Sequence, residues 1–515
     1  MPPLAPHQPG RRPTGELRRS LGVVDGLAIS ASSSAATTSI ALGMSSLAAA
    51  VGLQTPAVLL LAFLPVLGIA TAYARLNRSE PNCGNGYTWV GTSLGPWPGF
   101  LVGWVTVVGT VVFLAYTSAI CGSVVLQFAN RAGWNDFGLL PLDPNSTTLC
   151  TVVGLVVLIG VTTLAATGIR STARFQTTLL AFEYAVLLAF FTGALITGRQ
   201  TFSWSWFNPF AISDGAGFAQ GVVLAVFFFW GWDAAFSVTE ETKRTSDAAR
   251  AGFISLFAML GLFLFASVAL QRELSLAELI GNGPQMLPRI GARLADEPWA
   301  SLPLLALALS AVASVQSAMI PTARALFAMG RDRTMGRVWT RVHPIHGTPA
   351  AGTVLIMLIA AGLAVLATAI PKLSDMLLAA VSSGGLLVSL YYGLTALACA
   401  VRFRSALRAG FREAVLSVVV PAASGTVLLG IGVYLSGSYL TMSDHFEATP
   451  NNGWFMLSMP AAILVAGLTV AAWAKYGRRS PYFTSGRGTD EASLRLPMDT
   501  PEPRTVPGFP SGPRR

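Results

Sequence analysis

Three acidic residues lie within long apolar segments of the chain, at Asp25, Glu183 and Asp233. A charged side chain in such a segment is costly, so each is a candidate for function. Glu183 lies about ten residues into its segment, which at about 1.5 Å per residue is near the middle of a membrane-spanning helix. Burial favours the neutral form of a carboxyl, so Glu183 could bind and release a proton. The alternative is a structural carboxyl that is hydrogen-bonded between helices.

Asp25 is different, because it lies near the start of its segment. A carboxylate in the first turn of a helix interacts favourably with the helix dipole. A structural role is therefore the favoured interpretation of Asp25.

Two apolar segments are interrupted by residues that are unusual in a simple membrane-spanning helix. The first has a run of small, mostly hydroxylated residues, Ser30–Ser39, around its midpoint. The sixth has an aromatic cluster, Phe227–Trp230, followed by Gly231, Trp232 and Asp233. Interrupted helices at corresponding positions of two repeats are typical of a substrate site at the bilayer midplane. Alternatively, the hydroxylated run permits close helix packing, and the aromatic rings face lipid or the core.

The composition indicates a membrane around these residues. The 515-residue chain is 53% hydrophobic but only 11% charged, whereas globular chains carry about 25% charged residues. So few charged side chains cannot cover the surface of a soluble protein of this size. This excludes a soluble enzyme, a disordered chain and a nucleic-acid-binding domain. The four cysteines form no disulfide or metal framework.

Twelve apolar runs are long enough to span a bilayer, which takes about 20 residues per helix. They cover residues 21–49, 53–74, 97–128, 148–168, 175–197, 215–238, 252–270, 300–327, 350–370, 376–401, 414–436 and 455–474. Runs such as Val58–Leu67 are apolar all round, which predicts helices rather than the alternating strands of a barrel. The sixth run comes five helices after the first, so these two head halves of opposite orientation, as an inverted repeat requires.

The basic residues predict the orientation of the chain. With the N-terminus inside and twelve alternating helices, 28 of the 34 Lys and Arg residues fall on the inner side. Such a bias is typical of cytoplasmic loops. We therefore expect both termini to be cytoplasmic, and the net charge of +10 needs no nucleic-acid partner.

Several distinctive motifs stand at the ends of the spans and in the loops between them. Between the second and third spans stands Gly84-Asn85-Gly86-Tyr87-Thr88-Trp89-Val90, after a charged turn. The sixth span ends in Glu240-Glu241-Thr242-Lys243, and the eighth continues as Pro321-Thr322-Ala323-Arg324 and Met329-Gly330-Arg331-Asp332-Arg333. These motifs resemble those of the amino acid–polyamine–organocation (APC) permeases, and the likeness runs in order from about residue 20 to residue 410.

The resemblance implies an all-α integral membrane protein with a five-plus-five inverted repeat and two extra C-terminal helices. Together with the composition and charge of the two ends, it divides the chain into a cytoplasmic tail (1–20), two five-helix repeats (21–200 and 210–403), helices 11 and 12 (412–477) and a disordered cytoplasmic tail (478–515). It also implies secondary transport of amino acids or amines at the plasma membrane, commonly coupled to protons and without a cofactor.

The chain departs from the family pattern at two places. Family members usually carry glycines in the break of the first span, where Ser32, Ala36 and Thr38 stand here. This leaves room for an amine or a modified amino acid as substrate. Some proton-coupled members hold a lysine at or beside the position of Glu183, and a carboxyl there can also exchange protons.

These observations predict a proton-coupled importer of an amino acid or amine, and not an enzyme. We expect the substrate to contact the two interruptions and Glu183 to carry the proton. The expected substrate-binding residues are Ser32, Ser33, Ser34, Ala35, Ala36, Phe228, Phe229, Trp230 and Gly231. Further polar residues that could line the same cavity are Tyr116, Gln316, Ser317, Ser382, Ser383, Tyr391 and Tyr392.

The alternatives are an exchanger or a polyamine carrier on the same scaffold, and a transporter-like membrane receptor. A membrane-embedded enzyme is a third possibility, but the sequence has no paired acidic motif or metal-ligand cluster at one membrane face. No P-loop, nucleophile elbow or His-Glu-x-x-His motif is present, which disfavours ATP-driven or hydrolytic chemistry within this sequence. His343 and His346 have no Cys or acidic residues at ligand spacing, so a metal site is not expected.

Overall fold

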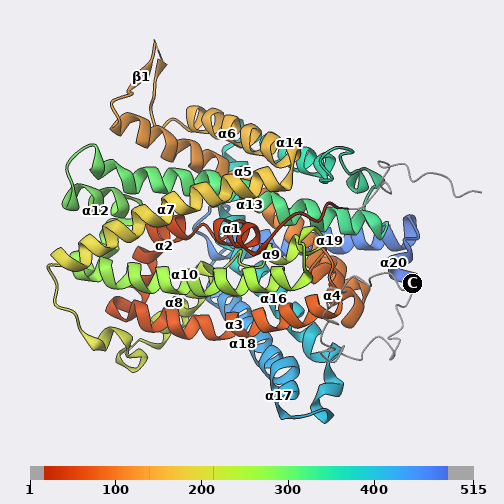
Figure 1. Cartoon of the computed structure of the whole chain (residues 1–515). Coiled ribbons are helices and arrows are strands. Elements are labelled where there is room, and N and C mark those ends of the chain that lie inside the picture. Colours follow the sequence, from red (N-terminus) through yellow and green to blue (C-terminus); the bar gives the residue numbers. More distant parts are fainter. Residues whose placement is uncertain (1–16, 139, 213, 485–515) are drawn as a thin grey trace, which may run out of the picture.

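The computed structural model describes residues 17–138, 140–212 and 214–484, most of which are helical (Figure 1). Residues 1–16 and 485–515, in the two predicted tails, lie outside the described residues. The second expected tail starts at residue 478, but residues 478–484 are described and include a short helix, α20 (Pro481–Thr484). Tyr482 in this helix stacks on Tyr87, with ring centroids 5.0 Å apart.

The helices up to residue 200 correspond to the first five predicted spans. They are α1 (Val23–Ser33), α2 (Ala36–Val51), α3 (Thr55–Ser79), α4 (Gly86–Ser93), α5 (Pro96–Arg131), α6 (Thr147–Thr167) and α7 (Ile169–Thr197). A two-stranded antiparallel hairpin of β1 (Asp136–Phe137) and β2 (Leu140–Pro141) projects between α5 and α6 (Figure 1).

The next group corresponds to the sixth to tenth predicted spans. Its helices are α8 (Gly215–Phe228), α9 (Ala234–Ser237), α10 (Thr245–Glu273), α11 (Leu276–Gly281), α12 (Met286–Leu294), α13 (Leu302–Arg331), α14 (Ala350–Ala369), α15 (Pro371–Ser382) and α16 (Gly384–Arg402). The tenth predicted span, 376–401, lies within Pro371–Arg402, which is long and apolar enough to cross a membrane, although Ser383 separates α15 from α16.

Two further helices complete the bundle. The first joins α17 (Phe411–Ala414), a π-helical turn η9 (Val415–Val419) and α18 (Val420–Thr441), and the second joins α19 (Gly453–Ala472) to a π-helical turn η10 (Trp473–Gly477). Short 3-10 turns connect the elements: η1 (Gly52–Gln54), η2 (Trp204–Phe207), η3 (Pro209–Ala211), η4 (Thr239–Glu241), η5 (Gly283–Gln285), η6 (Trp299–Ser301), η7 (Arg337–Thr340) and η8 (Arg404–Arg408).

Ten stretches of the described residues are helical, long and apolar enough to cross a membrane. One of them, Val23–Ser79, contains α1, α2 and α3, and the apolar part of α8, Gly217–Phe228, is shorter than the others. In a bilayer every backbone polar group must be satisfied within the protein, which a helix achieves along its own length. The chain is therefore a multi-pass helical membrane protein.

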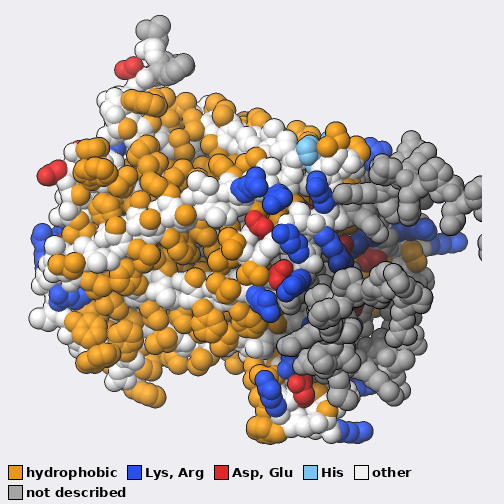
Figure 2. Space-filling view, in the orientation of Figure 1, with side chains coloured by type: hydrophobic (Ala, Val, Ile, Leu, Met, Phe, Trp, Pro, Cys, Tyr) orange, Lys and Arg blue, Asp and Glu red, His pale blue; other side chains and the backbone are white. Residues whose placement is uncertain are grey.

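The surface agrees with this assignment. Val156 of α6, Leu358 of α14 and Val433 of α18 are apolar and 66%, 56% and 73% exposed. Hydrophobic side chains cover most of the middle of the molecule, whereas many Lys and Arg residues gather towards the right-hand end of the view (Figure 2). A broad apolar belt of this kind fits the hydrocarbon layer of a membrane.

Ion pairs join the helix ends at this basic end of the bundle. Arg75 of α3 pairs with Glu413 of α17 at 2.6 Å, and Arg402 of α16 pairs with Glu80 at 2.6 Å. These contacts connect segments more than 300 residues apart in the sequence. Asp25 lies in the first turn of α1 and accepts the backbone N–H of Gly22 at 2.8 Å, which confirms the structural role expected for it.

Candidate functional site

The first interruption separates α1 from α2 at Ser34 and Ala35. Ala35 adopts the left-handed conformation (φ 45°, ψ 51°), which is uncommon for a residue with a side chain. It caps α2 without a side-chain hydrogen bond. The N–H groups of the first turn of α2 therefore have no partner from the helix itself. The prediction of a break within this hydroxylated run is confirmed.

The second interruption separates α8 from α9 and comprises Phe229–Asp233. Gly231 has φ +106°, a conformation that residues with a side chain rarely adopt. Phe228 is the last residue of α8, so the aromatic cluster extends across the end of the helix. The sixth predicted span is therefore interrupted, as its Gly and Asp suggested.

The two interruptions touch each other. A Cβ atom built on Gly231 would lie 2.6 Å from the carbonyl oxygen of Ser33 and 2.9 Å from the amide nitrogen of Ser34. The hydroxyl of Ser30 also donates a hydrogen bond to the carbonyl oxygen of Trp232. The unwound backbones of the two segments thus form one site, although they are about 200 residues apart in the sequence.

Replacing Gly231 by alanine is expected to push the two interruptions apart. Left-handed backbone costs a residue with a side chain about 1–2 kcal/mol, and overpacking costs about 1–3 kcal/mol. We expect a loss of about 2–5 kcal/mol in the free energy of unfolding and a slower uptake rate. Gly261→Ala in α10 is the matched control, because a Cβ there meets nothing within 4 Å. Equal effects of the two substitutions on stability and uptake would contradict the close approach.

Glu183 lies beside the first interruption. It belongs to α7, is 2% exposed, and accepts a hydrogen bond from the hydroxyl of Thr37, the second residue of α2. Ser310 of α13 also interacts with the carboxyl, although its hydroxyl makes no hydrogen bond within the described residues. The carboxyl of Glu183 is thus held at the start of α2, and its hydrogen bond with Thr37 depends on the position of this helix.

Two tyrosines of α16 bind the second interruption. The hydroxyl of Tyr392 donates to Asp233 Oδ1 at 2.7 Å and accepts the N–H of Gly231 at 3.4 Å. The hydroxyl of Tyr391 accepts the indole N–H of Trp230 at 2.7 Å. Their depth in the sequence predicts only that both could line the cavity. The structure places them on the interruption itself.

The three aromatic residues expected to act as a gate have different surroundings. Phe228 and Phe229 are buried and both pack on Phe263 of α10, with ring centroids 5.5 Å away. Trp230 instead packs against Phe113 of α5 at 5.7 Å. Phe228 and Phe229 thus have a core position, whereas Trp230 is half-buried and faces α5.

Several buried polar atoms around the interruptions have no hydrogen-bond partner within the described residues. They are Ser32 Oγ, Thr38 Oγ1 and Trp232 Nε1. Among the other expected site residues, Ser34 donates to the carbonyl oxygen of Ser30 at 3.2 Å, and Ala36 is 1% exposed. An unsatisfied buried polar group is costly, so these atoms are available to a polar ligand at the site.

A buried ion pair lies at the basic end of the bundle, near the second interruption. Arg324 of α13 donates two hydrogen bonds to Glu241 of η4, at 2.7 Å and 3.1 Å. The backbone N–H groups of Ser20 and Leu21 donate to the carbonyl oxygen of Glu241 at 2.7 Å and 3.0 Å. The N-terminal segment is therefore attached to this ion pair. The sequence motifs contained both charged residues, but nothing in them indicated that the two would pair.

The neighbouring Glu240 is nearer the surface and pairs with Arg331 at 2.8 Å. Burial raises the pKa of Glu240, but hydrogen bonds from Arg331 and from the N–H of Cys83 outweigh it, so the pKa stays below its ordinary value. Glu240 is therefore a carboxylate at neutral pH and part of the same charged network.

A family model described as amino acid permease matches residues 21–469. The low-affinity putrescine importer PlaP of Escherichia coli is 25% identical over 317 residues, which are 60% of this chain and 66% of that protein. The branched-chain amino acid permease BcaP of Bacillus subtilis is 25% identical over 299 residues, 57% of this chain and 63% of that protein.

Other relatives differ in what their names report. A methylthioribose transporter of Bacillus subtilis is 25% identical over 320 residues, 60% of this chain and 67% of that protein. An uncharacterised transporter of Mycobacterium tuberculosis is 27% identical over 456 residues, 82% of this chain and 91% of that protein. The alignments with the putrescine importer and with the branched-chain permease each cover slightly less than two thirds of that relative's length.

Proposed function

Because this chain belongs to the amino acid permease family of the APC superfamily, we propose that it is a proton-coupled secondary transporter that imports an amino acid or a related amine. Names of similar proteins include a putrescine importer, a branched-chain amino acid permease and a methylthioribose transporter. Two of these three substrates carry an amino group, and one of them has no carboxylate. The proposal rests on the amino group that putrescine and the branched-chain amino acids share.

The proposed membrane topology has twelve passes. The run Val23–Ser79 supplies two of them, α1 with α2 and then α3, and α8 with α9 supplies the sixth. The first five and the next five passes form an inverted repeat, each headed by an interrupted helix, and two helices follow. Both termini are cytoplasmic, in the plasma membrane, because that orientation places 28 of the 34 basic residues inside.

The substrate site is proposed at the contact between the two interruptions. The observation that supports it most is the close approach of Gly231 to the backbone of Ser33 and Ser34. Backbone amides at the start of α2, whose cap residue makes no side-chain hydrogen bond, bind the polar head of the substrate together with the hydroxyl of Ser32, which has no partner within the described residues. Trp230 covers the site, and a cationic amino group lies against its ring face.

The coupling proton is proposed to bind Glu183. Its carboxyl is buried and contacts no cation within the described residues, which favours the neutral form. Because Thr37 of α2 donates to it, loss of the proton changes the hydrogen bonding at the start of the broken helix. Proton release and movement of α2 are thereby linked.

Ligand binding is the first test of this function. The purified chain is heated with putrescine, leucine, isoleucine, valine or methylthioribose, and the apparent melting temperature is measured. A ligand at a hundred times its Kd stabilises the folded state by about 2.7 kcal/mol, so one of these compounds is expected to raise the melting temperature. Gly231→Ala is expected to remove the shift, and Gly261→Ala to keep it.

Uptake into proteoliposomes then separates the alternatives. An importer accumulates the bound compound without any internal counter-substrate. An exchanger takes it up only when the liposomes are preloaded, and a receptor shows binding with no flux. Uptake that requires preloading, or no uptake at all, would overturn the importer.

A further inference from the structure

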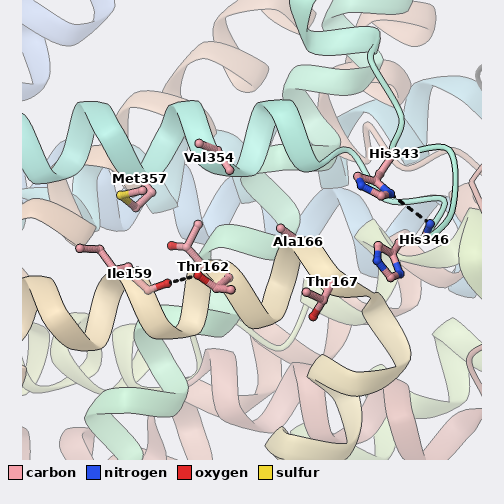
Figure 3. Close-up of a pocket in the computed structure, with 9 residues that line it drawn as sticks. Ile159, Thr162, Ala166, Thr167, His343, His346, Val354 and Met357 are labelled. Carbon is pink, nitrogen blue, oxygen red and sulfur yellow. Dashed lines mark hydrogen bonds between the residues drawn. The ribbon is translucent and has the colours of Figure 1, made fainter.

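A groove on the outside of the bundle is separate from the site at the interruptions. It has a volume of about 310 Å³ and lies between α6 and α14, next to the loop that carries His343 and His346 (Figure 3). None of its lining residues belongs to α1, α2, α7, α8 or α9. The volume is at the lower end of the range for ligand sites, about 300–1,000 Å³.

The walls of the groove are mostly apolar, and the hydroxyls of Thr162 and Thr163 in them are hydrogen-bonded to carbonyl oxygens of their own helix. Ile159 of α6 lies opposite Val354 and Met357 of α14 (Figure 3). Ile159 is 53% exposed and Val354 38% exposed. Both helices are long and apolar enough to span the membrane. The molecule that meets this part of the groove in a bilayer is therefore a lipid acyl chain.

The end of the groove is polar and supplies hydrogen-bond donors. The Nδ1 atom of His343 accepts the backbone N–H groups of Ile345 and His346, both at 3.3 Å. The ring hydrogen of His343 is therefore on Nε2, which has no partner within the described residues. The ring of His346 stacks on that of His343, with centroids 4.7 Å apart. Two imidazoles thus stand together at the mouth of the groove.

The charge around this mouth is positive. Arg170 follows the last lining residue of α6 by three positions, and Arg341 precedes His343 by two. Both are exposed, and no ion pair to either occurs among the described residues. The sequence contains no Asp or Glu in residues 144–182 or 333–374, which include both walls and the histidine loop. The surroundings therefore attract an anion.

We propose that this groove binds an anionic phospholipid, with one acyl chain between α6 and α14 and the phosphate at His343 and His346. The apolar walls and the basic, acid-free mouth are complementary to the two ends of such a lipid. A zwitterionic lipid lacks the net negative charge that the mouth attracts. This inference does not depend on the proposed transport, because binding is measured without flux.

Native mass spectrometry of the full chain in detergent tests the proposal, with phosphatidylglycerol and phosphatidylcholine of identical acyl chains as probes. Phosphatidylglycerol is expected to bind more tightly. The double substitution His343→Ala and His346→Ala is expected to weaken it about tenfold, which is the loss of one hydrogen bond to a charged group. Val354→Trp, which fills the groove, is expected to weaken both lipids.

His445→Ala is the matched control, because His445 is exposed in the loop between α18 and α19. It is expected to leave lipid binding unchanged, and inorganic phosphate alone is expected not to compete with phosphatidylglycerol. Equal binding of the two lipids by the wild-type chain would overturn the proposal, as would unchanged phosphatidylglycerol binding in the double variant. If the double variant does not fold, the test rests on Val354→Trp. Unchanged phosphatidylglycerol binding in that variant would overturn the proposal.

Discussion

Replacing Glu183 by glutamine is expected to abolish accumulation of substrate driven by a pH gradient. Glutamine keeps the size of the side chain and can still accept the hydrogen bond from Thr37, but it cannot release a proton. A gradient of one pH unit corresponds to about 1.4 kcal/mol, or about a tenfold accumulation, for one coupled proton. We expect this accumulation in the wild-type chain and an internal concentration no higher than the external one in the variant.

Binding is expected to survive the same substitution, because the proposed substrate contacts lie on the interruptions. The thermal shift with ligand should therefore persist in Glu183→Gln. Glu297→Gln is the control, since Glu297 is half-exposed and lies far from α7 in the sequence. Unchanged accumulation in Glu183→Gln would eliminate its coupling role. If Asp233→Asn alone abolished accumulation, the proton would have to be assigned to Asp233, which Tyr392 contacts.

Replacing Arg324 by methionine is expected to destabilise the protein by about 3–5 kcal/mol, because removal of one partner leaves a buried charge uncompensated. Arg324 is 4% exposed and Glu241 is completely buried. The N-terminal segment is attached to Glu241 through backbone hydrogen bonds, so it is expected to loosen as well. Thermal or denaturant unfolding of the purified protein measures the loss of stability.

Arg131→Met is the matched control for this substitution. Arg131 pairs with Glu297 at 2.7 Å, but that glutamate is 51% exposed, and exposed ion pairs contribute about 0–1 kcal/mol. The double variant Arg324→Met and Glu241→Met is expected to recover much of the lost stability, because no charge remains buried. Equal losses for Arg324→Met and Arg131→Met would show that the buried pair is not important for stability.

The positions of both interruptions could be predicted from the sequence because their residues are unusual for a lipid-facing helix. Hydroxyls at Ser30–Ser39 and the Gly231–Asp233 sequence stand out within apolar runs. Glu183 was also identifiable, because a lone carboxyl at mid-depth is costly. These are local signals, which a single sequence contains.

The missed features depend on contacts between distant segments. Phe228 and Trp230 pack against different helices because α8 ends at Phe228. A run of four aromatic residues does not indicate where the helix ends. The separation of α15 from α16 at Ser383 had only two hydroxyls as a signal. The pairing of Arg324 with Glu241 joins residues 83 positions apart. Such pairings cannot be deduced from composition or periodicity.

Substrate-induced proton movement in proteoliposomes tests the central claim most directly. The wild-type chain is reconstituted with a pH-sensitive dye inside the liposomes, and the compound that raised the melting temperature is added outside. We predict that the interior acidifies as the compound enters, and that Glu183→Gln removes the acidification. Uptake of the compound against its gradient with no change of internal pH would contradict proton coupling at this site.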